Sequence, residues 1–224
     1  MLLQDNAFLL FSRNQGETSL WLSVLTERYG RLQLTYKGGQ KKAAGLLNFS
    51  PLSLSWRLGK QGGGWIASCE SFAYQSPLQG MANWSGLYTN ELLHRALMAD
   101  QPVPNLYQAY AALMDGLRSS NHDRNHMAWA LRSFEWVFIA EMGYGLPTQT
   151  YDHKPLSAQA CYQWQSEGWY PSETGIHGTE LLALIGQSKQ GKSSRALREL
   201  LQWRLLQAMP NQALSMRHWW EQLK

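Results

Sequence analysis

Residues 30–42, near the front of the chain, read GRLQLTYKGGQKK and give the clearest indication of the fold. From Leu32 to Tyr36 every second residue is apolar, the residues between them are polar, and basic residues flank the stretch at Arg31 and Lys37. This period of two is typical of a strand with one buried face. The two glycines and two lysines that follow predict a basic loop from Gly38 to Lys42.

Similar alternating stretches occur on both sides of this segment. The strands that we expect cover residues 8–13, 19–26, 31–37, 52–58 and 65–72. Five short strands with glycine turns predict a small Greek-key barrel of the OB type over residues 1–78, with an SH3-like barrel as the alternative. The fold class that follows is α+β, an OB-fold barrel followed by an α-helical domain over residues 79–224.

After Pro77 the apolar period changes to that of helices. The pattern predicts helices at residues 87–98, 106–117, 126–142, 194–207 and 215–223, and a short helix or a strand at residues 180–185. Between them, residues 147–177 are polar and aromatic without a clear period, so we expect an irregular insert there.

The charge of the chain is unevenly distributed. The net charge is +4, and residues 1–80 hold eight Lys and Arg against four Asp and Glu, while residues 81–145 hold four against six. A basic segment attracts polyanions by counterion release, whatever their sequence. No apolar run is long enough to span a bilayer and no signal peptide is evident, so the sequence predicts a cytoplasmic, nucleoid-associated protein with two free thiols, Cys69 and Cys161.

The cations of the predicted barrel are candidates for contacts with the phosphates of DNA. We expect these contacts from Arg13, Arg31, Lys37, Lys41, Lys42, Arg57 and Lys60. Trp21 and Trp65 are the best candidates for stacking on bases, because Trp21 is out of phase with its apolar neighbours and Trp65 borders a glycine-rich turn. The alternative is that these side chains are ordinary surface charges and packing aromatics.

One motif indicates a different class of protein. Residues 186–193 read GQSKQGKS, which satisfies the Walker A pattern of a phosphate-binding loop. A small nucleotide-binding enzyme that uses Lys192 and Ser193 is therefore an alternative. The motif lacks a clear preceding strand and a later acidic residue for Mg²⁺, so we predict no catalytic residue and no cofactor.

The order of several short stretches resembles the RecO family of bacterial recombination mediators. These stretches include AFLLFSR at 7–13, ETSL at 17–20, GLL at 45–47, GLYTNELLHR at 86–95, LRSFE at 131–135 and GYGL at 143–146. The resemblance implies an N-terminal OB domain and a helical domain. It also implies binding of single- and double-stranded DNA, annealing of complementary strands, and help in loading RecA onto DNA coated with single-strand binding protein (SSB).

The resemblance further implies two direct protein partners, RecR and the C-terminal tail of SSB. An acidic tail would meet Arg132 beside Leu131, with Arg118 and Arg124 as charges at the rim. Arg132 has an alternative partner in Glu135, one helical turn away. Some family members hold zinc through four cysteines, but only Cys161 lies in the matching segment here, so we predict no metal. A pure adaptor that docks such a tail without touching DNA remains a further alternative.

Overall fold

The computed structural model describes residues 1–59, 63–71, 75–120, 123–166 and 168–209, with residues 43–45 described by their backbone alone. The chain forms two compact units that divide between Gln108 and Ala109, inside helix α2 (Pro104–Ser119). Helix α1 (Gly80–Ala96) therefore belongs to the same unit as the strands that precede it.

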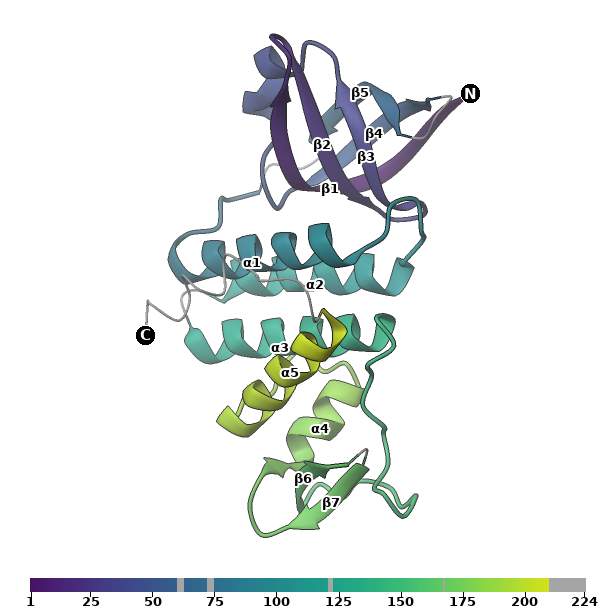
Figure 1. Ribbon diagram of the computed structural model, residues 1–224. Coiled ribbons are helices and arrows are strands. Elements are labelled where there is room, and N and C mark those ends of the chain that lie inside the picture. The colour runs from purple at the N-terminus through teal and green to yellow at the C-terminus, as the bar shows by residue number, and fades with distance from the viewer. Residues whose placement is uncertain (60–62, 72–74, 121–122, 167, 210–224) are drawn as a thin grey trace. The chain divides into compact units, whose positions relative to one another are not determined.

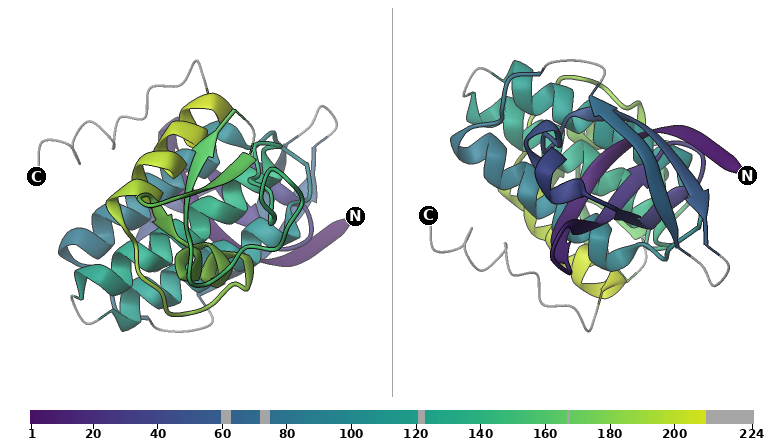
Figure 2. Two further views of the ribbon diagram at one scale, coloured as in Figure 1. Left: turned by 90° about the horizontal axis from the view of Figure 1, so that it is seen from below. Right: turned by 90° about the horizontal axis from the view of Figure 1, so that it is seen from above.

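Five strands close into a barrel in the first unit (Figure 1). Around the barrel the order is β1-β2-β3-β5-β4, and β1 pairs with both β2 and β4. The pairs are antiparallel except for β3 with β5. This arrangement confirms the predicted OB-fold barrel followed by helices, and the view from above in Figure 2 shows the strands wrapped around one another. The strand bounds are Leu2–Gln15 (β1), Ser19–Thr26 (β2), Gly30–Tyr36 (β3), Pro51–Leu58 (β4) and Gly64–Ser71 (β5).

The alternating apolar side chains fill the barrel. Trp56 is fully buried, and the ring of Tyr29 meets it edge to face with 5.2 Å between the ring centroids. The apolar face predicted for β3 is confirmed, because its members are all buried. The barrel core contains Ala7, Leu9, Leu20, Leu22, Val24, Leu32, Leu34, Tyr36, Leu52, Leu54, Trp56 and Ile66.

The basic segment after β3 is helical, so the prediction of a loop there is wrong. Residues Gly39–Gly45 form a short 3-10 helix, η1. Gly38 permits the turn into it with a φ of +66°, a conformation that favours glycine. The backbone N–H of Gln40 donates to the carbonyl of Thr18 at 3.1 Å, which fixes η1 beside the turn between β1 and β2.

Helix α1 is joined to the barrel by polar and apolar contacts. The side-chain amide of Asn90 donates to the Leu9 carbonyl at 3.2 Å. Gly86 faces the Phe49 ring so closely that an added Cβ would lie 2.8 Å from it. A larger residue at this position would push the helix away from the barrel.

The second unit contains helices and a small sheet. Helix α5 (Arg195–Ala208) packs against α3 (Arg124–Glu141), and α4 (Gly178–Ile185) follows the sheet directly. The sheet has the antiparallel order β7-β6-β8, with bounds Cys161–Gln165 (β6), Gly168–Ser172 (β7) and Ile176–His177 (β8). The predicted irregular insert is therefore partly a sheet. The helix predicted at residues 215–223 lies outside the described residues.

Within the described part of the chain, none of the helices combines the length and the apolar character needed to cross a bilayer.

Candidate nucleic-acid interface

The register of the barrel places one row of outward side chains next to one another. Arg13 on β1 lies opposite Trp21 on β2, Trp21 lies opposite Thr35, Thr35 lies opposite Trp65 on β5, and Trp65 lies opposite Arg57 on β4. Residues paired in this way point to the same face of a sheet. We call these five residues the outer band. It crosses four strand spacings, about 19 Å of barrel surface.

The outer band has an arginine at each end, a tryptophan next to each arginine and Thr35 in the centre. The guanidinium carbon of Arg13 lies 4.7 Å from the Trp21 ring centroid, and the ammonium of Lys37 lies 5.7 Å from that of Trp65. Arg13, Lys37 and Arg57 are exposed, and none of the five residues of the band is acidic. Such cation–π contacts orient a charge without neutralising it, so the cations stay available to an anion.

The two lysines of η1 extend this basic surface beyond the strands. Lys41 and Lys42 are exposed, and the Lys42 ammonium lies 5.3 Å from the centroid of the Tyr36 ring at the end of β3. The Gln40 side chain donates to the carbonyls of Gly16 and Ser19, at 3.2 and 3.3 Å. The predicted cations Lys37, Lys41 and Lys42 thus lie near the turn that follows Arg13.

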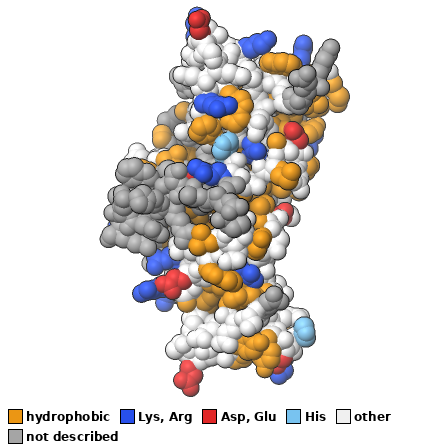
Figure 3. All heavy atoms as spheres, viewed as in Figure 1, with side chains coloured by type: hydrophobic (Ala, Val, Ile, Leu, Met, Phe, Trp, Pro, Cys, Tyr) orange, Lys and Arg blue, Asp and Glu red, His pale blue; other side chains and the backbone are white. Residues whose placement is uncertain are grey.

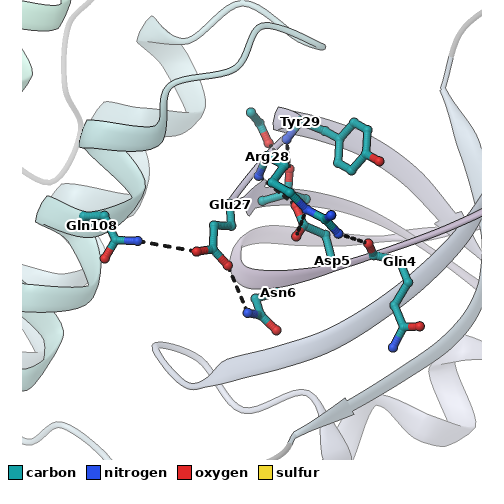
Figure 4. A network of polar contacts seen from close by, with 9 residues as sticks. Gln4, Asp5, Asn6, Glu27, Arg28, Tyr29 and Gln108 are labelled. Atoms are coloured by element: carbon teal, nitrogen blue, oxygen red, sulfur yellow. Dashed lines mark hydrogen bonds and ion pairs between the residues drawn. The ribbon is translucent and has the colours of Figure 1, made fainter.

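The acidic residues of the barrel are mostly elsewhere. Asp5 is buried and accepts from the backbone N–H and the Nε of Arg28, at 2.8 and 3.0 Å (Figure 4). Glu27 accepts from the side chains of Asn6 and Gln108, at 2.9 and 3.5 Å. Glu70 lies five residues from Trp65 on β5, roughly 16 Å along the strand. The exception is Glu17, in the turn after Arg13.

Figure 3 shows one face of the molecule with this mixture of side chains. Over the barrel, Lys and Arg side chains (blue) lie beside exposed hydrophobic side chains (orange). Phosphate needs a cation, and an unpaired base offers a flat apolar face, so such a surface has complements for both parts of a nucleotide.

Arg31 does not belong to this surface. Its side chain is buried, and its Nε donates to the Leu97 carbonyl at 2.8 Å. Burial lowers the pKa of the guanidinium, and the nearby Asp100 partly opposes that effect. Arg31 therefore holds the end of α1 against β3 and is withdrawn from the predicted phosphate contacts. Lys60, another predicted contact, lies outside the described residues.

Two further aromatic rings, those of Phe11 and His94, contact Trp21. The Phe11 ring lies 6.3 Å from the Trp21 ring, and the His94 ring of α1 lies 6.0 Å from it, both edge to face. Phe11 and His94 are themselves stacked at 5.1 Å. Phe11 was missed by the sequence reasoning because it ends an apolar run. A register shift between Leu9 and Phe11 turns its side chain outward, and the alternation of the run gives no sign of that bulge.

The residues predicted to hold an acidic peptide are only partly exposed. Leu131 and Arg132 are buried in α3, and the Nη2 of Arg132 donates to the Glu135 carboxylate at 2.8 Å. Arg118, on α2, has a pKa lowered chiefly by burial, and its Nη1 lies 3.9 Å from the Asp115 carboxylate. Of these four residues, only Arg124, at the start of α3, is exposed. The structure favours the alternative partner Glu135 for Arg132.

The Walker-like segment does not have the geometry of a phosphate loop. Helix α4, and no strand, precedes it. The Trp129 indole donates to the Ser188 carbonyl at 2.9 Å, and the Ser194 amide donates to the buried Glu180 carboxylate at 3.0 Å. A carboxylate thus takes an amide that a phosphate would need, and its charge opposes a second anion. The nucleotide-binding alternative is therefore not supported.

Comparisons with known proteins agree with this fold. An OB-fold barrel followed by helices defines the structural class. The family model described as recombination protein O N terminal matches residues 1–74, and the model described as recombination protein O C terminal matches residues 79–150.

Individual relatives carry the same name. The DNA repair protein RecO of Pseudomonas paraeruginosa is 34% identical over 184 residues, which cover 79% of this chain and 76% of that protein. The DNA repair protein RecO of Vibrio parahaemolyticus is 36% identical over 146 residues, 63% of this chain and 58% of that protein. The chain belongs to the RecO family of DNA repair and recombination proteins.

Proposed function

We propose that this protein binds single- and double-stranded DNA through the outer band together with Lys37, Lys41 and Lys42. Bound in this way, it anneals complementary strands and assists RecA loading onto SSB-coated DNA, without a catalytic residue. The observation that carries the proposal is that the exposed Arg13 and Arg57 are in register with Trp21 and Trp65, that the Lys37 ammonium lies beside the Trp65 ring, and that the outer band has no acidic member.

Contacts to phosphate suit this task because they carry no base code. A protein that anneals strands of any sequence must neutralise the backbone and leave the base edges free to pair. Strand pairing is itself favourable, so bringing two shielded strands together requires no nucleotide hydrolysis. The protein would act at the bacterial nucleoid, in the cytoplasm.

For the SSB tail and RecR we propose the second unit as the docking region. Arg124 is exposed and Arg118 is partly exposed on neighbouring helices, so they offer charges to an acidic tail. Leu131 and Arg132 would support this surface from beneath, because both are buried. The RecR contact is proposed on the family relationship alone.

The test is DNA affinity as a function of salt, measured by fluorescence anisotropy. We expect the double variant Lys37→Glu/Arg57→Glu to bind oligonucleotides much more weakly and with a shallower salt dependence, by about 1.4 in the logarithmic slope for single strands. The matched control is Lys154→Glu/Arg195→Glu. It changes the net charge equally, at exposed residues of the second unit that are paired with Asp152 and Glu199.

Each result decides between the proposal and the adaptor alternative. Equal losses in both variants would mean that net charge, and not the outer band, governs binding. Absence of any salt-dependent binding in the wild type, together with binding of an SSB tail peptide, would replace the proposal by the adaptor.

A further inference from the structure

Trp65 has a different environment from the other tryptophan of the outer band. Its side chain is 46% exposed, and none of the ring–ring contacts among the described residues involves it. Its neighbours across the strands are Thr35 and Arg57, and the Lys37 ammonium lies 5.7 Å from its ring centroid. Trp65 therefore presents a flat apolar surface between two exposed cations.

The backbone beneath Trp65 is held from both sides. Trp65 pairs with β3 and with β4, and the preceding Gly64 lies where the strands crowd together. A Cβ at Gly64 would lie 2.5 Å from the Arg57 carbonyl oxygen and 3.1 Å from a methyl group of Leu34. A ring on such a fixed strand loses little backbone freedom when a ligand stacks on it.

The Trp21 ring, by contrast, is already in contact with other side chains of the protein. Phe11 and His94 lie against it edge to face, and the Arg13 guanidinium covers its ring. Its side chain is only half-exposed. Trp21 is therefore suited to hold Arg13 in place and not to receive another ring.

We propose that Trp65 stacks on an unpaired nucleobase of single-stranded DNA while Lys37 and Arg57 contact the adjoining phosphates, and that Trp21 positions Arg13. This rests on the proposed function and adds a base contact to it. The occupant follows from complementarity, because cations on both sides of an open aromatic face match the alternation of phosphate and base. A duplex keeps its bases stacked on one another, so Trp65 would favour single strands, whereas the cations serve both forms.

The test compares an oligothymidylate with an abasic oligomer of the same length, which keeps the phosphates and lacks the bases. Trp65→Ala should weaken oligothymidylate binding about tenfold, as expected for the loss of one base–aromatic stack, and leave the abasic oligomer unchanged. Trp65→Phe should keep most of the affinity. Trp21→Ala should weaken both oligomers equally, because it releases a phosphate contact. Trp203→Ala, at a comparably exposed tryptophan of the second unit (43%), should change neither.

A second measurement uses the unmodified chain. Photo-crosslinking with an oligonucleotide that carries 5-iododeoxyuridine, followed by mass spectrometry, should give an adduct at Trp65. An adduct at Trp21 in its place, or an equal effect of Trp65→Ala on both oligomers, would overturn the stacking assignment while salt-dependent binding still supports the proposed function. A wild type that binds neither oligomer would overturn both proposals.

Discussion

The outer band of the barrel and the buried face of α3 both carry arginine, but in opposite surroundings. Arg57 lies exposed between Trp65 and Leu2, on strands that leave its charge to solvent. Arg132 is 5% exposed and is paired with Glu135, which is 1% exposed. An arginine side chain is therefore exposed only where no other element of the chain covers its strand or helix face.

The greatest change in stability is expected at the buried Arg132. Arg132→Ala should lower the free energy of unfolding by about 3–5 kcal/mol, because it leaves the Glu135 carboxylate buried without this partner. Arg57→Ala should change it by no more than about 0.5 kcal/mol, as is usual for an exposed position. Urea denaturation of both variants measures the difference.

The control for Arg132 removes both charges together. Arg132→Met/Glu135→Leu should recover part of the lost stability, because it removes the buried carboxylate together with its guanidinium partner. If Arg132→Ala were as stable as the wild type but failed to bind an SSB tail peptide, Arg132 would be a binding residue and the comparison would be wrong.

Arg31 gives the next largest effect and separates structure from DNA binding within the barrel. Arg31→Met should cost about 1.5–3 kcal/mol of stability, because it removes the charged donor to the Leu97 carbonyl. The salt slope of DNA binding should not change, since the side chain is buried. A shallower salt dependence of DNA binding at unchanged stability would mean that Arg31 contacts DNA after all.

Arg31 also marks the limit of what could be predicted from sequence. The strand alternation correctly placed Leu32, Leu34 and Tyr36 inside, because a closed barrel requires one apolar face. It also placed Arg31 outside, but the residue that covers it, Leu97, lies 66 positions later in the chain. Local patterns contain no information on such a distant contact.

The second unit was less predictable for a related reason. Strand β6 reads CYQWQ, which is too short for a clear period, and it pairs with β8, which follows a bend at Gly175 after β7. There an added Cβ would meet the Tyr162 carbonyl oxygen at 2.3 Å. The candidate site was predictable in residue type, since its cations lie in a basic segment, but its register was not. Only the pairing of β3 with β5 brings Thr35 beside Trp65.

The smallest change in stability is expected at His94 of α1, whose ring contacts Phe11 and Trp21. Burial is the main cause that lowers the pKa of His94. The charges of Arg31, Arg95 and Arg13 lower this pKa further, and Glu91 opposes them. The unfolded chain therefore takes up the proton first as the pH falls below about 6.5. The stability contributed by neutral His94 is complete above that pH and is lost as the pH falls towards the lowered pKa.

His94→Phe should keep the stack on Phe11 and remove the titration, so its stability should fall less between pH 7 and about pH 5.5 than that of the wild type. Urea denaturation at the two pH values measures this difference. Parallel losses in both proteins would assign the acid sensitivity to other groups. A smaller loss in the variant would assign this part of the acid sensitivity to His94, whose pKa is lowered chiefly by burial and further by Arg31, Arg95 and Arg13.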